Sequence, residues 1–367
     1  MTRRALLLVA ALALMPALLV LLPSPAAQTS ASRLPPRLSG QEFLSLMTEL
    51  SEADGFFRSD NLVSNELFMQ RVIPDLTRVV KPGGVYLGVG PEQNFTYMAA
   101  VKPAMAFIID VRRGNLQLHL MYKALFELSS DRADFVSRLF SLKRPAGLDR
   151  SSPVQDIFAA YADSRLRSPE LYKQNLGAIK RLFARKNGLE LSQEDLAGIE
   201  GIYQEFYTKG LDIHYEVTPG SAGSFPTYRE LMVATDGTSA PRSYLATDEN
   251  FTLIKELHGR NLIVPIVGNF GGPKAIRAVG KYIRARNSVV AAFYVSNVEQ
   301  YLMRDDSIDQ FCASAASLPL DAASTFIRSE RGGLPARGGE RTPRGGFGGN
   351  FNSKVRDMIG DLKSCMR

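Results

Sequence analysis

The sequence predicts an α/β domain, a mostly parallel β-sheet with helices on both faces, and three observations support this class. Apolar runs of strand length alternate with amphipathic helical stretches along most of the chain. In residues 85–113 a strand, a glycine turn, a helix and a second strand follow one another, which is the first half of a nucleotide-binding βαβ unit. A chain of 367 residues that is 45% hydrophobic is also long and apolar enough to bury a substantial core.

The first 26 residues have the pattern of a signal peptide. Arg3 and Arg4 precede an apolar run over residues 5–22, and the small residues Ser24 and Ala26 follow it. Cleavage after Ala26 fits this order. An uncleaved anchor is the alternative, because the run approaches the roughly 20 residues that span a bilayer. In both cases the arginines favour export of the body, so we expect a periplasmic or secreted protein that meets a membrane only through this segment if it stays uncleaved.

The composition divides the rest of the chain into four parts. Residues 27–40 contain several prolines, serines and threonines and predict a linker. Residues 41–330 predict a single domain, in which the charged helical stretch 151–209 is an insertion. The Gly/Arg-rich segment 331–352 cannot bury enough apolar surface to order itself, so we expect a disordered tail, followed by a helix over residues 353–367.

The net charge of +7 belongs to the ends of the chain. Residues 27–330 contain 34 basic and 34 acidic side chains, whereas the segment from residue 331 onward contains eight basic and three acidic ones. The tail also carries few aromatic residues. We therefore expect no specific nucleic-acid partner.

Within the domain, the strands and helices are predicted from the spacing of apolar residues and from the glycines and prolines that end each run. Strands are expected at residues 85–89, 105–111, 211–217, 262–267 and 289–295, with a last edge strand at 324–329. Helices are expected at residues 41–52, 67–80, 116–128, 249–259, 273–285 and 298–318. Pro265 removes a ladder donor from its strand, so that strand is either bulged there or not fully central.

The two cysteines, Cys312 and Cys365, are too few for a disulfide framework and too far apart for a redox or zinc motif. In an exported chain they can pair and tie the last helix to the body. Two free, buried thiols are the alternative.

Two glycine-bearing loops follow predicted strands and are the main candidates for a ligand site. Gly88 and Gly90 follow the first strand, and Asp110 ends the second strand twenty residues after Gly90, where a carboxylate can accept hydrogen bonds from a ribose. Gly268 and Asn269 open the second loop, after the Pro265 strand. If these two strands are neighbours at the point where strand order reverses, both loops face one crevice. The amides at the two helix starts would then attract an anion or a polar ligand.

Other polar residues near strand ends complete the candidate site. Glu92 is a candidate cofactor contact, or else an acid favoured at a helix start by the helix dipole. Residues 56–66 contain a polar run that is either a ligand-facing loop or a helix lead-in. The candidate substrate contacts are Ser59, Asp60, Asn61, Asn65, Tyr294, Ser296 and Asn297.

The sequence assigns no catalytic residue and no metal site. It contains no GxSxG elbow, no HExxH motif and no phosphate-binding loop. The histidines lack the spacing of metal ligands, and His119 borders an apolar helical stripe, which is typical of a packed or surface histidine.

Residues 81–84 (KPGG), the glycine-bearing strand end and Asp110 together resemble class I S-adenosylmethionine-dependent methyltransferases. The resemblance covers residues 60–130, and residues 250–300 more loosely. It implies a Rossmann-like, methyltransferase-like fold in which the glycine loop holds the methionine part of S-adenosylmethionine and Asp110 holds the ribose.

The chain departs from this family at two positions. Tyr86 stands where the family usually has an acid, and Glu92 stands where it has a third glycine. Segments such as SDNLVSNE and VGPEQNFTYMAA also resemble those of an uncharacterised group of bacterial proteins of this fold, here with an export signal. The resemblance therefore implies the fold more strongly than the cofactor.

The expected function is that of an exported α/β protein that binds a small polar or nucleoside-like ligand at the carboxyl ends of its strands. Export separates the protein from S-adenosylmethionine, which is a cytoplasmic metabolite. An active S-adenosylmethionine-dependent methyltransferase is the alternative, and a non-catalytic module that binds a partner protein is a second alternative.

Overall fold

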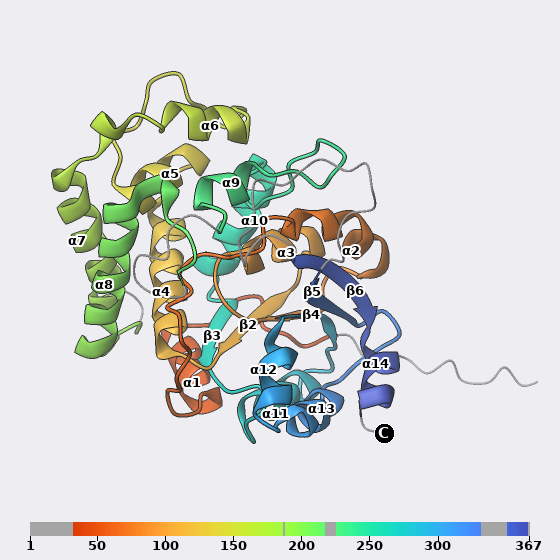
Figure 1. Cartoon of the computed structure of the whole chain (residues 1–367). Coiled ribbons are helices and arrows are strands. Elements are labelled where there is room, and N and C mark those ends of the chain that lie inside the picture. The colour runs from red at the N-terminus through yellow and green to blue at the C-terminus, as the bar shows by residue number, and fades with distance from the viewer. Residues whose placement is uncertain (1–31, 186–187, 217–224, 332–350, 366–367) are drawn as a thin grey trace, which may run out of the picture. The chain divides into compact units, whose positions relative to one another are not determined.

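A six-stranded sheet forms the centre of the computed structural model (Figure 1). The structure describes residues 32–185, 188–216, 225–331 and 351–365. The strands are β1 (Val85–Gly88), β2 (Met105–Asp110), β3 (Ile263–Val267), β4 (Val290–Ser296), β5 (Thr325–Arg331) and β6 (Phe351–Asp357). They lie in the order β3-β2-β1-β4-β5-β6, and every neighbouring pair is parallel except β5 and β6. The predicted α/β class with a mostly parallel sheet is confirmed.

Helices cover both faces of the sheet. The helices are α1 (Gly40–Leu50), α2 (Ile73–Val79), α3 (Gln93–Val101), α4 (Arg113–Leu128), α5 (Arg132–Phe140), α6 (Val154–Ala160), α7 (Pro169–Arg185), α8 (Gln193–Lys209), α9 (Tyr228–Val233), α10 (Asp248–Gly259), α11 (Ala275–Arg284), α12 (Val298–Arg304), α13 (Ile308–Ala316) and α14 (Met358–Cys365), with short 3₁₀ turns η1 (Met69–Val72), η2 (Ser164–Leu166) and η3 (Gly210–Asp212). Figure 1 shows α3, α4 and α10 on one side of the sheet and α11 and α13 on the other. Because both faces are covered, β1, β2 and β3 are buried along their whole length and consist almost entirely of apolar residues.

Aromatic side chains fill both interfaces between sheet and helices. Phe95 of α3 packs edge-to-face against Tyr122 and Phe126 of α4, with ring centroids 5.2 and 5.4 Å apart. On the other face, Phe107 of β2 lies 5.6 Å from Tyr282 of α11. Residues on both sides of the sheet thus belong to one hydrophobic core.

Pro265 lies in β3, which is an edge strand, so the prediction that its strand is not fully central is confirmed. Pro265 pairs in regular register with Ile108 of β2. Two residues further along the strand, the amide of Val267 donates to Ser51 Oγ at 3.0 Å on the side away from β2. Alternate residues of a strand direct their amides to the same side, so the missing N–H of Pro265 also lies on the open side.

The predicted helical insertion at residues 151–209 contains α6, η2, α7 and α8. In this insertion Tyr161, Ile179, Leu182 and Phe183 are buried, whereas Leu166, Leu171 and Leu176 are only partly buried. Helix α8 packs on α4, where Asp195 pairs with Arg113 at 2.7 Å.

The predictions for the last part of the chain need correction. Residues 353–357 belong to a strand, β6, and the terminal helix begins only at Met358. Strand β6 pairs with β5 in seven positions, from Thr325 opposite Asp357 to Arg331 opposite Phe351, so β5 is not an edge strand. Of the tail predicted to be disordered, residues 331–352, Arg331 ends β5 and residues 351–352 begin β6, whereas residues 332–350 lie outside the described part.

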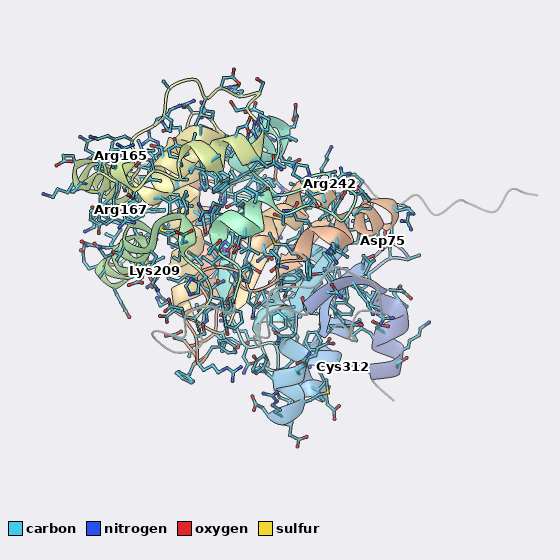
Figure 2. All side chains as sticks on the ribbon, turned by 45° about the horizontal axis from the view of Figure 1, so that its top comes forward. Asp75, Arg165, Arg167, Lys209, Arg242 and Cys312 are labelled. Atoms are coloured by element: carbon cyan, nitrogen blue, oxygen red, sulfur yellow. A yellow bond between two sulfur atoms is a disulfide. The ribbon has the colours of Figure 1, made fainter. Side chains whose placement is uncertain are left out.

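Cys312 of α13, labelled in Figure 2, and Cys365 of α14 form a disulfide, with Cα atoms 5.9 Å apart. The paired alternative therefore holds in this structure. Met358 and Leu362 of α14 are buried in the hydrophobic core of the domain. Strand pairing, apolar burial and the disulfide all attach the end of the chain to the body.

Three smaller expectations are also corrected. The strand expected at residues 211–217 does not form over its described part, residues 211–216, where the chain makes the turn η3 and a single bridge between His214 and Thr227. The helix expected at 298–318 is divided into α12 and α13, and the helix expected at 67–80 begins with η1.

The predicted signal peptide lies outside the described residues. Among the helices that the structure does describe, none has the length and hydropathy needed to cross a membrane.

Candidate functional site

A cavity of about 210 Å³ lies beyond the carboxyl ends of β1, β2, β3 and β4. Of the residues predicted from the sequence, those that line it are Asn61, Asn65, Gly90, Asp110, Gly268, Asn269, Tyr294, Ser296 and Asn297. The cavity lies beyond the ends of the neighbouring strands β1 and β4, where the strand order reverses. Ligands of parallel sheets characteristically bind at such a point.

The two glycine loops share this cavity although their strands are not neighbours. β1 pairs with β2 and β4, and β2 separates it from β3, so the adjacency expected as the condition for one shared crevice is absent. The loops meet because β2 ends between them at Asp110, whose carbonyl accepts a hydrogen bond from the Gly268 amide at 2.8 Å.

Glycine is required at positions 90 and 88 for two different structural reasons. Gly90 has a φ of +76°, and a Cβ on it would meet only the Asn61 side-chain amide, 3.4 Å away. Gly88 does not line the cavity. A Cβ on Gly88 would overlap the side chain of Asn94, which accepts from the Tyr86 hydroxyl at 2.9 Å and donates to the Pro91 carbonyl at 2.7 Å. Gly88 therefore shapes the turn through Asn94, and the structure does not place this predicted cofactor contact at the cavity.

Replacing Gly90 by valine is expected to lower the free energy of unfolding by roughly 1 to 3 kcal/mol, because a β-branched residue is strained at positive φ. Chemical denaturation measures this change. Gly114→Ala is the matched control, since Gly114 lies in helix α4 at an ordinary φ and its Cβ would meet no atom within 4 Å. Alanine should stabilise that helix slightly. An equal effect of both variants would contradict the strain assigned to Gly90.

Glu92 is the other predicted cofactor contact that is not among the residues lining the cavity. It precedes the first residue of α3 and is completely buried, and its carboxylate accepts from the Ser64 amide at 3.2 Å. Burial raises the pKa of Glu92 from 4.5 to about 8. Burial also lowers the pKa of His119 to about 4, and His119 Nε2 lies 2.9 Å from the Gly90 carbonyl. The core behind the glycine turn thus favours an uncharged carboxyl and an uncharged imidazole.

Asp110 is held by Arg112 in the wall of the cavity. The Asp110 carboxylate accepts from the backbone amide of Arg112 at 3.0 Å and from its guanidinium Nε and Nη2 at 3.1 Å each. The same guanidinium donates to the backbone carbonyls of Ser59 and Asp60. Ser59 and Asp60 do not line this cavity, and the Ser59 hydroxyl donates to the Glu216 carbonyl. The structure does not place these two predicted contacts at this cavity, and their backbone carbonyls position Arg112.

The amides at the start of α11 are occupied by a carboxylate of the protein itself. Glu52 accepts from the backbone amides of Asn269 at 3.0 Å, Lys274 at 2.9 Å and Ala275 at 2.7 Å. The amide of Glu52 in turn donates to the Val267 carbonyl at 2.8 Å, which fixes this segment along the end of β3. The predicted attraction of an anion to the second glycine loop is therefore satisfied internally.

A buried carboxylate that the sequence analysis missed, Glu66, lies behind the cavity wall. It is 2% exposed and accepts hydrogen bonds from Tyr294 Oη and Ser296 Oγ at 2.8 Å each, from Gln93 Nε2 at 2.8 Å and from Ser353 Oγ at 3.1 Å. Ser353 comes from β6, so the last strand of the sheet contributes to this network. Glu66 ends the polar run 56–66, but the run alone does not show which of its residues becomes buried.

Local backbone geometry directs Ser296 toward Glu66. Ser296 ends β4 with a φ of +50°, and the register with β5 shifts between Tyr294 and Ser296. A serine in this region is uncommon and marks a conformation imposed by its surroundings. The shift places the Tyr294 and Ser296 hydroxyls on the same carboxylate oxygen, Glu66 Oε1.

Sequence reasoning also missed Arg112, Ser64 and Gln93 in the lining, and the aromatic residues at the rim. Phe57 and Tyr301 line the cavity, and their rings pack edge-to-face with centroids 5.3 Å apart. Among the residues that the structure describes, no group of histidine, cysteine and acidic side chains is arranged to hold a metal ion.

Comparison with known proteins places the chain in a family. No curated protein matches it. A family model described as "Domain of unknown function (DUF7790)" matches residues 62–337, which include the glycine turn, Asp110 and Glu66. Because this match covers most of the chain, the protein belongs to the DUF7790 family.

Proposed function

We propose that the protein binds a small, polar, nucleoside-like ligand in the cavity at the carboxyl ends of its parallel strands. The observation that carries this proposal is the meeting of Gly90 and Asp110, from the ends of consecutive strands, in one cavity where the strand order reverses. The order 3-2-1-4-5-6 is also that of doubly wound nucleotide-binding sheets, which supports a Rossmann-like classification.

The lining provides the contacts that a nucleoside-like ligand needs. A carboxylate has about four acceptor positions, and Arg112 uses three of those of Asp110, so one remains for a ligand hydroxyl. The Phe57 and Tyr301 rings offer flat apolar surface for a base or another ring. The side-chain amides of Asn61 and Asn297 add donors and acceptors.

S-adenosylmethionine is the second candidate ligand, favoured by the position of Asp110 and Gly90, which resembles that in class I methyltransferases. Pro91 follows Gly90 and removes one backbone donor from the turn, which weakens this candidate. The export that we propose for the chain also separates it from the cytoplasmic supply of this cofactor. A module that binds a partner protein remains the third candidate.

Isothermal titration calorimetry of the purified protein with adenosine and with S-adenosylhomocysteine tests these candidates. We expect adenosine to bind, and Asp110→Asn to weaken its affinity about 10- to 100-fold, because a hydrogen bond to a charged group contributes roughly 1.5 to 3 kcal/mol. Asp75→Asn is the matched control: Asp75 lies on α2 with 62% of its side chain exposed and does not line the cavity (Figure 2).

Each other outcome favours another candidate. Tight binding of S-adenosylhomocysteine with no binding of adenosine would favour the methyltransferase. No heat from either compound at millimolar concentration would contradict a nucleoside-like ligand and favour the partner-binding module. An equal loss in Asp110→Asn and Asp75→Asn would place the bound ligand outside this cavity.

A further inference from the structure

We propose that the ligand directs a hydrogen-donating, positively charged group, such as a primary ammonium, toward the side of the cavity formed by Ser64, Gln93, Tyr294 and Ser296. We call these four side chains, backed by Glu66, the acceptor wall. The inference rests on the proposed function for the existence of a ligand and adds the chemical class of the group that faces this wall.

The hydroxyl hydrogens of the wall point away from the cavity. A hydroxyl has a single hydrogen, and those of Tyr294 and Ser296 are both donated to Glu66 Oε1 at 2.8 Å. The hydroxyl of Ser64 is donated to Gln93 Oε1. These three groups therefore have only lone pairs left for a ligand.

Gln93 is saturated as a donor too. Its amide group has two hydrogens, one directed to Glu66 Oε2 at 2.8 Å and the other to Tyr97 Oη at 2.7 Å. Ser353 closes the network behind the wall, because it donates to Glu66 at 3.1 Å and lies 2.9 Å from Tyr97 Oη. Glu66 thus accepts from Gln93, Tyr294, Ser296 and Ser353, the Ser64 hydrogen goes to Gln93 Oε1, and the wall offers the cavity lone pairs without hydrogens.

The charge behind the wall has no cationic partner. Glu66 is 2% exposed, and among the described residues no lysine, arginine or histidine forms an ion pair with it. The other buried acid of the cavity, Asp110, is paired with Arg112. Arg58 and Arg304 lie near the Tyr301 ring at the rim, but both are exposed, so solvent screens their charge.

A buried, unpaired carboxylate favours a cation nearby because charges interact more strongly in a region of low dielectric constant. An ammonium also brings the hydrogens that the wall lacks. A carboxylate or phosphate in the same place would face lone pairs, would be repelled by Glu66 and would lose its hydration. The wall therefore selects ammonium over a neutral hydroxyl, and a hydroxyl over an anion.

Three nucleosides that differ at a single position test this order. We expect 5′-amino-5′-deoxyadenosine to bind at least 10-fold more tightly than adenosine, and the 5′-carboxylate of adenosine to bind at least 10-fold more weakly, by calorimetry near neutral pH. Equal affinities, or tighter binding of the carboxylate, would overturn the inference while leaving a nucleoside-binding function in place.

A second series without a nucleoside separates the two proposals. Benzylamine, benzyl alcohol and benzoate carry the same three groups on one ring, and protein-observed NMR can measure their weak binding. If no nucleoside binds but benzylamine binds best and benzoate worst, the nucleoside class fails and the inference stands. If the ring compounds bind without this order, the inference fails.

Variants assign the preference to the wall. In Glu66→Gln the wall loses its charge, and we expect the ratio of amine to hydroxyl affinity to fall at least 5-fold. Glu256→Gln, which removes an acid with 53% exposed side chain from α10, should leave the ratio unchanged. If Glu66→Gln does not fold, Tyr294→Phe and Ser296→Ala each remove one acceptor and should lower the same ratio. An unchanged ratio in folded wall variants would overturn the inference.

Discussion

Ending the chain at Arg331 is expected to lower the melting temperature by more than 10 °C or to prevent folding. The truncation removes β6, which pairs with β5 in seven positions, and buried Met358 and Leu362. Burial of each of these side chains contributes roughly 1.5 to 3 kcal/mol. The truncation also removes the Cys312–Cys365 disulfide, which closes a loop of 53 residues and contributes on the order of 4 kcal/mol in the chain-entropy model. These losses are comparable with the whole stability of a typical domain.

A second variant separates the docked elements from the segment that precedes them. Arg331 and Phe351 are directly paired, so a two-residue Asn-Gly turn can replace residues 332–350 without moving β6. We expect this variant to melt within a few degrees of the natural chain in differential scanning calorimetry. A truncation that melts like the full chain would show that β6 and α14 do not hold the domain together. A fall in the Asn-Gly variant as large as that in the truncation would assign the stability to residues 332–350.

Glu92→Gln is expected to stabilise the protein increasingly as the pH rises from 4.5 to 8. The pKa of Glu92 is about 8 in the folded protein and 4.5 in the unfolded chain, because burial disfavours its charged form. Between pH 4.5 and 8 the folded protein therefore binds one proton more than the unfolded chain. Its free energy of unfolding falls by roughly 1.4 kcal/mol for each pH unit across this window. Glutamine does not titrate. The free energy of unfolding of the Glu92→Gln variant should therefore exceed that of the natural protein by a margin that grows to about 5 kcal/mol at pH 8 and stays constant above it.

Denaturant unfolding of both proteins at pH 4.5, 6 and 8 measures this difference. Burial lowers the pKa of His119, which costs the folded state stability as the pH falls below 6.5, but His119 is present in both proteins and cancels. The exposed Glu256→Gln variant controls for the loss of one carboxylate. A difference between glutamate and glutamine at position 92 that stays constant with pH would contradict an uncharged, buried Glu92.

The parts of the fold that the sequence predicted are those whose signal is local. Strands β2 and β3 are runs of apolar residues bounded by turns, and they are buried on both faces, so hydrophobicity alone identifies them. Strand β6 has the sequence FNSKVRD, in which polar residues dominate, and none of the side chains at positions 352–357 is buried. Only its pairing with β5 makes it a strand, and that pairing is not visible in the segment itself.

The same distinction holds for the candidate site. Gly90 and Asp110 follow from the strand–turn–helix pattern, which requires a flexible turn and presents an acid at the next strand end. The pattern could not separate Gly90 from Gly88, because the difference depends on how Asn94 folds back onto the turn. It also could not identify Glu66, whose burial depends on Tyr294 and Ser353 from distant strands.

The network around Glu66 has a consequence for how the molecule folds. Its hydrogen bonds join residues that are 27, 228, 230 and 287 positions apart in the chain. Closing such long loops costs entropy that is recovered only when both ends are in place, so contacts of this kind form late in folding. Refolding should therefore restore helical circular dichroism before it restores the ability to bind a ligand. A partly folded chain would have most of its secondary structure and an open, unselective cavity.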